Sequence, residues 1–256
     1  RGARPVSSPR RAGGVVTATV GGFGDVTHTF VQRDSGVDGW ALPDMVPVGP
    51  RYPETGGLTD VDHFAVCVES GQLDATVEFY ERVLGFDLIF AEQVVIGAQA
   101  MTTKVVESTS RAVTLTIIEP DVSRVAGHID EFLADHGGPG VQHIAFTVDD
   151  IVAAVESLSA RGIGFLATPA TYYAMLPERV RLARYTVDEL RSHHILVDQD
   201  HDGQLYQIFT ESVHPRNTIF MEVIERLGAR SFGSGNIKAL YQAVEAQRHR
   251  DDAAAA

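Results

Sequence analysis

The chain has 256 residues, of which 44% are hydrophobic, so it can bury one large core or two smaller ones. Its formal net charge of −13 argues against nucleic acid or a membrane surface as a partner, because both attract clustered Lys and Arg. A single cysteine, Cys67, excludes a disulfide framework and a cysteine-based metal site, and no apolar run resembles a membrane span or a signal peptide; we therefore expect a cytoplasmic protein with a small substrate.

Residues 1–50 are expected to hold the end of an N-terminal domain and a linker. Two spacings recur along the chain. Arg-Gly followed by Pro occurs at residues 1–9 and again at 161–169, and Gly followed by a strand-like segment that ends in Phe occurs at residues 24–30 and again at 203–209. Such self-similarity indicates a repeated structural unit. Because Arg1 stands where a helix should already be ending, we expect the earlier part of this unit to precede it in a longer chain. Pro and Gly residues over 43–58 predict the linker.

Residues 51–256 are expected to form the main domain, built from two β-α-β-β-β units. Each unit begins with an alternating strand, Asp62–Val68 or Gln142–Val148, followed by an amphipathic helix over residues 73–84 or 150–161. Further strand-like runs lie at residues 86–90, 100–107 and 113–118 in the first unit and at 164–167, 194–198, 204–210 and 218–225 in the second. The pattern predicts an α+β fold of tandem units that curl into half-barrels, with a C-terminal helix over residues 236–247 packed against them.

Two histidines and a glutamate occupy positions that would meet inside such a cup. His63 and His143 stand at equivalent places in the two first strands, so their side chains project from equivalent faces. One histidine alone in a core strand is more often a structural residue, but the duplication favours a shared site. Glu222 lies in the otherwise apolar segment Thr218–Ile224, where an unpaired carboxylate is costly or becomes protonated.

These three residues predict a metal centre. Two imidazoles and one carboxylate form a facial set that leaves positions on iron(II) open for substrate and dioxygen. Two alternatives stay open at this point. Zinc in a hydrolase uses the same donor types, and Glu222 could instead form a salt bridge with Arg226.

Short motifs spread along the chain carry a family resemblance. They are Asp62-His63, Phe79-Tyr80-Glu81, Leu84-Gly85-Phe86, Gly140 to Ala145, Thr171-Tyr172-Tyr173, Ile195 to Asp198, Gln207 to Thr210, Phe220 to Arg226 and Phe232 to Asn236. Through them the chain resembles the 4-hydroxyphenylpyruvate dioxygenase family of the vicinal oxygen chelate superfamily, from residue 1 to about residue 248. The resemblance implies a glyoxalase-like fold, an oxidoreductase that acts on 4-hydroxyphenylpyruvate and dioxygen, a homodimer, and iron(II) held by His63, His143 and Glu222. These are the ligands that the strand pattern selects independently.

By the same resemblance, further residues would bind the substrate. Gln142 and Gln207 would line the pocket, Phe209 would cover one face of the aromatic ring, and the C-terminal helix would close the mouth. The complete set implied is Thr103, Thr116, Ile118, Gln142, Gln207, Phe209, Phe232, Asn236, Ile237 and Tyr241. In the implied reaction the keto acid chelates the iron, carbon dioxide leaves and a carbon of the substrate is hydroxylated.

This chain departs from the homogentisate-forming dioxygenases where substrate contacts are expected. The departures are Thr103 for a usual Ser, Thr116-Ile117-Ile118 for Pro-x-Asn, His128 for a Gln, Ile237 for the Phe of Gly-Asn-Phe-Lys, and Tyr241 for a Phe. These changes resemble the 4-hydroxymandelate synthases, which hydroxylate the benzylic carbon and supply hydroxyphenylglycine for peptide antibiotics. A homogentisate-forming dioxygenase and a non-enzymatic binding protein of the same fold are the alternatives. The binding protein would need no iron, so the intact triad argues against it.

Overall fold

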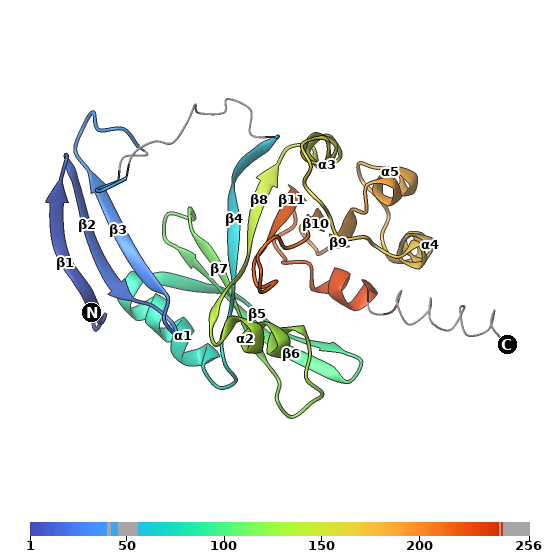
Figure 1. Cartoon of the computed structure of the whole chain (residues 1–256). Coiled ribbons are helices and arrows are strands. Elements are labelled where there is room, and N and C mark those ends of the chain that lie inside the picture. The colour runs from blue at the N-terminus through green and yellow to red at the C-terminus, as the bar shows by residue number, and fades with distance from the viewer. Residues whose placement is uncertain (40–41, 46–55, 241, 243–256) are drawn as a thin grey trace.

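The computed structural model describes residues 1–39, 42–45, 56–240 and 242 and contains two β-sheets (Figure 1). The smaller sheet is an antiparallel meander of β1 (Pro5–Ala12), β2 (Val15–Gly21) and β3 (Thr27–Arg33). The residues between β1 and β2, Gly13 and Gly14, have φ of 55° and 75°, which suits a two-residue hairpin. The predicted linker falls largely on residues 46–55, outside the described part of the chain.

The larger sheet has eight strands in the order β5-β6-β7-β4-β8-β11-β10-β9. From the central pair β4 and β8, each unit runs outward to the edge in the same order, with its first strand next to its last. Its strands are β4 (Leu58–Cys67), β5 (Phe86–Ile96), β6 (Gln99–Ser108), β7 (Thr114–Pro120), β8 (Gly140–Val148), β9 (Leu196–Gln199), β10 (Gln204–Phe209) and β11 (Phe220–Leu227). In each unit the first strand pairs in parallel with the last, and the two first strands, β4 and β8, pair antiparallel with each other. The sheet order confirms the predicted repeat.

Two of the helices confirm the predicted ones. These are α1 (Leu73–Phe79), extended by the π-helical turn η1 (Tyr80–Leu84), and α3 (Ile151–Ala160). The sequence pattern does not predict α2 (His128–His136), α4 (Ala170–Arg179) or α5 (Val187–Ser192). Since α4 contains Pro177 and α5 has only six residues, neither shows the long apolar period on which a helix prediction rests. No helix in the described residues is long and apolar enough to cross a membrane.

The predicted strand at residues 164–167 is wrong. This segment makes one isolated bridge, between Phe165 and Thr210, before the chain enters α4. Pro169 has no backbone N–H and therefore cannot extend a ladder. The segment still follows the end of β10, because the Leu166 amide donates to the Phe209 carbonyl at 2.9 Å. Leu166 is thereby brought to the inner side of the sheet.

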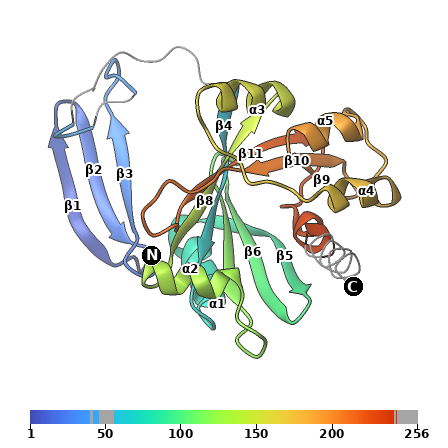
Figure 2. The same ribbon diagram turned by 45° about the vertical axis from the view of Figure 1, so that its right-hand side comes forward.

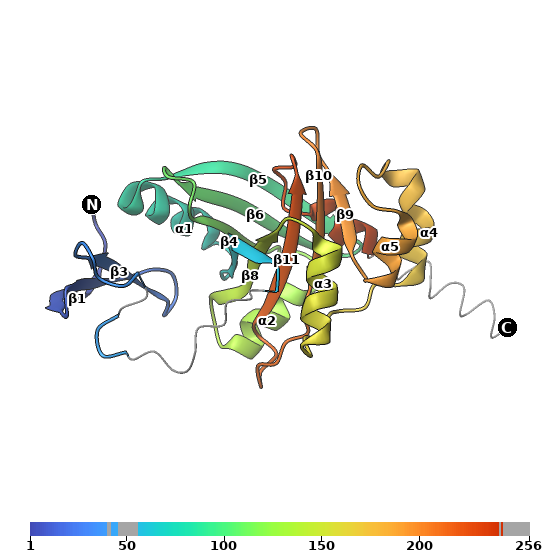
Figure 3. The same ribbon diagram turned by 90° about the horizontal axis from the view of Figure 1, so that it is seen from above.

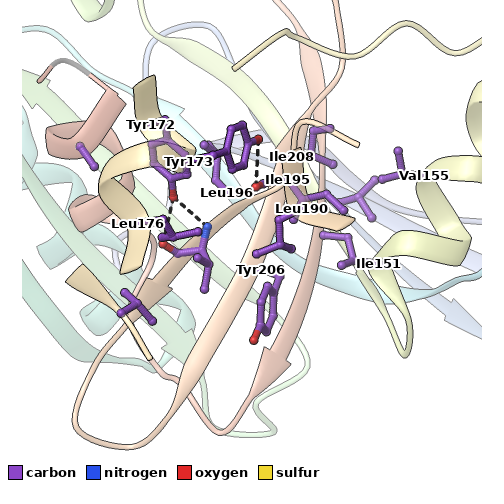
Figure 4. Close-up of a cluster of buried hydrophobic side chains, with 14 of the residues drawn as sticks. Ile151, Val155, Tyr172, Tyr173, Leu176, Leu190, Ile195, Leu196, Tyr206 and Ile208 are labelled. Carbon is purple, nitrogen blue, oxygen red and sulfur yellow. Dashed lines mark hydrogen bonds between the residues drawn. The ribbon is translucent and has the colours of Figure 1, made fainter. Parts of the chain in front are cut away.

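Among the helices described, α1, α3, α4 and α5 cover the outer face of the large sheet, whereas α2 packs on the inner side against Val94 and Met101. In the second unit α3, α4 and α5 pack over side chains such as Val223. Because side chains alternate along a strand, the neighbouring Glu222 projects from the inner face. Figure 4 shows this core, in which the Tyr173 hydroxyl on α4 donates to the Ile195 carbonyl at 3.1 Å, while the Tyr172 hydroxyl lies 3.1 Å from the Val197 carbonyl oxygen. The outer layer of helices therefore leaves the centre of the inner face to residues such as Glu222.

The large sheet is curled, and residues 234–240 form a short helix at its open side (Figure 2, Figure 3). Lys238 Nζ lies 3.2 Å from Glu92 Oε1 on β5, and the Gly235 amide donates to Asp198 Oδ2 on β9 at 2.8 Å. Because β5 and β9 are the edge strands, this helix ties the two rims of the half-barrel together. The predicted C-terminal helix is confirmed as far as residue 240, while residues 241 and 243–247 lie outside the described part.

The turn between β9 and β10 is held by the Asp200 carboxylate. Its oxygens accept hydrogen bonds of 2.6 to 3.0 Å from the amides of Asp202 and Gly203 in the turn and of Arg230 and Ser231 after β11. Burial opposes the charged form, but these four amides lower the pKa of Asp200 to about 2. The carboxylate thus fastens the segment after β11 to the hairpin.

We expect Asp200→Asn to lower the free energy of unfolding by about 1 to 2 kcal/mol at neutral pH, because Asn presents an NH2 group to two amides that need an acceptor. Since the pKa of Asp200 is depressed in the folded protein, its contribution is present above pH ~4 and is lost as the pH falls toward ~2. Urea unfolding at neutral and acidic pH measures both effects. Asp202→Asn is the control, because within the described part of the chain that side chain forms ion pairs of 3.2 and 3.5 Å with His201 and Arg230 and accepts no backbone hydrogen bond. Equal losses in the two variants would contradict the role of Asp200.

Candidate metal centre and active site

His63, His143 and Glu222 come from three adjacent strands and converge around one small residue, Ala145. In the pairing of β4 with β8, His63 is opposite Ala145, and in the pairing of β8 with β11, Glu222 is opposite the same residue. His143 precedes Ala145 by two positions on β8 and therefore projects from the same face. The two units thus place the three side chains together at the centre of the sheet.

The three ligand atoms surround a common point. Nε2 of His63 and Nε2 of His143 lie 3.5 and 3.3 Å from Glu222 Oε2, and the three atoms all lie within 4.8 Å of one another. Glu222 is 2% exposed and His63 is 3% exposed. Burial lowers the pKa of His143 despite the adjacent carboxylate, which favours the neutral imidazole that binds a metal. This donor set fits a divalent cation.

An ion pair orients His63. Asp62 Oδ1 lies 2.7 Å from His63 Nδ1, and Arg226 donates to the same carboxylate through two hydrogen bonds of 2.7 and 2.9 Å. Burial disfavours the charged carboxylate, but these partners hold the pKa of Asp62 far below its usual range. With Nδ1 donating to Asp62, Nε2 is left to face the site. Arg226 therefore pairs with Asp62 and not with Glu222, so the salt-bridge alternative is wrong.

A β-bulge orients His143. The register between β4 and β8 shifts at this point, so Gln142 and His143 both reach the inner side of the sheet. Gln142 Oε1 lies 3.3 Å from His143 Nδ1, which again leaves Nε2 to face the site and Glu222. Phe220 stacks on the His143 ring at a centroid distance of 4.9 Å. Packing and the hydrogen bond together restrict rotation of this imidazole.

Glu222 is held by a pair of buried amides. Gln207 Nε2 donates to Glu222 Oε1 at 3.1 Å, and Asn236 Nδ2 donates to Gln207 Oε1 at 3.0 Å. The segment before the C-terminal helix approaches so closely that a Cβ at Gly233, whose φ is 76°, would lie 1.9 Å from Gln207 Oε1. Only glycine tolerates both conditions. Both ends of the Gln207 amide are therefore engaged within the protein.

A cavity of about 210 Å³ lies next to the triad. Most of the residues expected to bind substrate line it, namely Thr103, Thr116, Ile118, Gln142, Gln207, Phe209, Phe232 and Ile237. Asn236 is buried behind Gln207 and does not reach the wall. Tyr241 lies outside the described residues. The structure thus brings to one place residues that are spread over more than half of the chain.

His128, which the resemblance puts in place of a pocket Gln, also lines the wall, together with residues that the sequence analysis does not select, which are Phe90, Glu92, Val94, Met101, Leu166, Phe220 and Ser234. Phe90, Glu92 and Val94 alternate along β5. Because Glu92 pairs with Thr103, these three side chains lie on the same face as an expected pocket residue. The period of two in β5 could therefore have identified them. His128 begins α2 and projects into the cavity, where burial lowers the pKa of its imidazole.

The sequence comparison assigns this curled sheet and its triad to a known class of protein. Residues 60–208 match the family model of the Glyoxalase/Bleomycin resistance protein/Dioxygenase superfamily. The chain is 34% identical over 264 residues to 4-hydroxyphenylpyruvate dioxygenase of Dictyostelium discoideum, which covers 96% of this chain and 72% of that protein. It is 35% identical over 262 residues to the enzyme of that name from Danio rerio, with 96% and 66% covered. The chain therefore belongs to the 4-hydroxyphenylpyruvate dioxygenase family of that superfamily.

Solved structures confirm the predicted vicinal oxygen chelate fold. A triple mutant of 4-hydroxymandelate synthase from Streptomyces coelicolor matches with 42% identity and a TM-score of 0.78, covering 96% of this chain and 71% of that one. A xylose isomerase-like TIM barrel/4-hydroxyphenylpyruvate dioxygenase fusion protein matches with 27% identity and a TM-score of 0.57, covering 73% and 29%. The chain spans 65% of the length of the Aspergillus fumigatus dioxygenase, to which it is 34% identical.

Proposed function

We propose that this protein is an iron(II)-dependent dioxygenase that converts 4-hydroxyphenylpyruvate and dioxygen into 4-hydroxymandelate and carbon dioxide. The observation that carries the proposal is the buried triad of His63, His143 and Glu222 beside a largely apolar cavity. The reaction balances when one oxygen atom of dioxygen enters the carboxylate that remains after decarboxylation and the other becomes the benzylic hydroxyl.

The triad residues would hold the iron, and bound iron would supply the activation of dioxygen that side chains cannot. Three ligands on one face leave positions for the keto acid and dioxygen. The rest of the chain keeps these ligands in place, because Asp62 orients His63 and Gln207 holds Glu222. Membership in a family of dioxygenases supports iron over zinc.

The cavity wall suits an aromatic keto acid. Phe209 lies edge-on to His143 at 5.9 Å between ring centroids, and Phe232 lies edge-on to His63 at 5.2 Å. Aromatic surface thus flanks both imidazoles and excludes water from the place where the substrate would bind. Thr103 and Thr116 supply hydroxyl groups in the same wall, which would orient the polar ends of the substrate.

Two observations support the mandelate product. Ile118 and Ile237 pack on the same apolar cluster and line the cavity, at positions where the resemblance implies Asn and Phe in homogentisate-forming enzymes. The identity to the solved synthase is 42%, and the identities to the Aspergillus and Danio dioxygenases are 34% and 35%. Because those relatives are named 4-hydroxyphenylpyruvate dioxygenase, the homogentisate-forming reaction implied by the resemblance is the second candidate.

Incubation of the protein with iron(II), ascorbate, 4-hydroxyphenylpyruvate and air tests the proposal. We expect dioxygen uptake to be matched by formation of 4-hydroxymandelate. The two candidate products are isomers, so chromatography against authentic standards must separate them. Homogentisate as the product would replace the proposed reaction by the second candidate, and absence of dioxygen uptake by the iron-loaded protein would refute both.

The remaining assignments follow from the same function. We propose a cytoplasmic homodimer that makes a precursor of hydroxyphenylglycine for peptide antibiotics, with neither nucleic acid nor membrane as a partner. The net charge of −13 supports this choice of partners. Residues 1–50 would belong to an N-terminal domain and residues 51–256 to the catalytic domain, a division supported by the separate sheet of β1 to β3. Light scattering of the purified protein tests the dimer.

A further inference from the structure

A row of hydrogen bonds runs from Glu222 to the guanidinium of Arg179 on α4. Beyond Gln207 and Asn236 it continues to Tyr172, whose hydroxyl donates to Asn236 Oδ1 at 2.7 Å. Nη2 of Arg179 lies 3.3 Å from Tyr172 Oη and 3.4 Å from Asn236 Oδ1. The row therefore joins the inner face of the sheet to a helix that packs on its outer side.

The middle members of this row are buried. Gln207 is 3% exposed, Asn236 1% and Tyr172 2%. Buried polar groups must find their partners within the protein, so the orientation of one amide constrains the next. Arg179, by contrast, lies at the surface end of the row. Its side chain is the point at which the row can be altered without opening the core.

The two ends of the row determine the direction of every hydrogen bond in it. Arginine can only donate, and an ionised carboxylate can only accept. Asn236 must therefore turn its oxygen toward Arg179 and its NH2 group toward Gln207. Gln207 must in turn direct its NH2 group to Glu222, as the structure shows.

Arg179 also contacts one of the two acceptors of the Tyr172 hydroxyl. That hydroxyl has two acceptors in reach, Asn236 Oδ1 at 2.7 Å and the Val197 carbonyl at 3.1 Å. The Arg179 guanidinium donates to the Val197 carbonyl at 2.7 Å, so this carbonyl already has a charged donor. Asn236 Oδ1 is the nearer of the two acceptors of the Tyr172 hydroxyl.

We propose that Arg179 is a positioning residue of the metal centre. By holding the Asn236 oxygen it fixes both amides in the orientation that the carboxylate also requires, so that Gln207 Nε2 donates to Glu222 Oε1 and Oε2 is left facing the two imidazoles. The proposal rests on the proposed function, in that the triad binds a metal. Without Arg179, Asn236 Oδ1 and the Val197 carbonyl lose a charged donor, so Asn236 and Gln207 are held less firmly and the Glu222 carboxylate can rotate away from the two imidazoles.

The test compares binding of Co(II) to the metal-free protein and its variants, without substrate, by the visible absorption of the bound ion. Arg179→Met keeps the aliphatic stem and removes the donors, and we expect about tenfold weaker binding and an altered spectrum. Arg179→Lys restores a donor and should recover most of the affinity. Arg191→Met, on α5, is the matched control, because that side chain is 59% exposed and pairs with Asp188.

A second variant tests the route. Asn236→Asp keeps an acceptor for Arg179 and Tyr172 but cannot donate to Gln207, so its loss of Co(II) affinity should be at least as large. Wild-type affinity and spectrum in Arg179→Met would overturn the proposal, and so would wild-type binding in Asn236→Asp. Thermal unfolding of the metal-free proteins identifies a variant that is merely unfolded, in which case the other variant decides. A wild-type protein that binds no Co(II) would refute the metal centre itself, and the inference with it.

Discussion

Glu222→Gln is expected to abolish dioxygen uptake and to weaken metal binding by far more than the ~100-fold that loss of an outer partner costs. Gln fills the same volume but carries no charge, and its NH2 group would meet Gln207 Nε2, which now donates to Glu222 at 3.1 Å. The metal-free protein should stay folded, because the change removes a buried charge. The rise in melting temperature on addition of metal should vanish.

An oxygen electrode and thermal unfolding with and without metal measure these effects. His143→Ala removes a second ligand and should lose dioxygen uptake in the same way. Glu156→Gln is the control, because this glutamate is 64% exposed and pairs with His193; it should behave as the wild type. Near wild-type turnover in either ligand variant would mean that the triad is not the metal centre.

Ile237→Phe is expected to divert part of the product from 4-hydroxymandelate to homogentisate or another ring-oxidised species. Ile237 lies on the helix of residues 234–240 and, with Ile118, lines the cavity of about 210 Å³. A phenyl ring there takes up space that the substrate ring would need in order to turn its benzylic carbon toward the triad. A displacement of about an ångström is enough to change a rate about a hundredfold. Decarboxylation should persist, since no ligand changes.

Chromatography of the products of wild type and variant measures the diversion. Leu240→Phe is the matched control, because it adds the same ring to the same helix, while Leu240 packs on the outer core and does not line the cavity. Its product should stay benzylic. A purely benzylic product at undiminished turnover in Ile237→Phe would show that Ile237 does not control which carbon is oxidised.

The repeat, the fold class and the triad were accessible from the sequence, because each depends on a local pattern. The direction of a side chain in a strand follows from its position, with a period of two. Equivalent positions in two copies of one unit therefore meet at equivalent places, which is why His63 and His143 could be paired. Glu222 could be added because a carboxylate in an apolar strand needs a cation. The helix α4 was not accessible in this way, because Pro177 interrupts its pattern.

Only the tertiary structure decided which side chains support the triad. Asp62 pairs with Arg226 across 164 positions of the chain, and Tyr172 reaches Asn236 across 64. No local period relates such residues, since their contact depends on the curl of the whole sheet and on where α4 and the C-terminal helix pack. The same curl brings β5, with Phe90, to the cavity wall. A strand pattern specifies the face from which a side chain projects, but the partner it meets there is set by how distant segments close over that face.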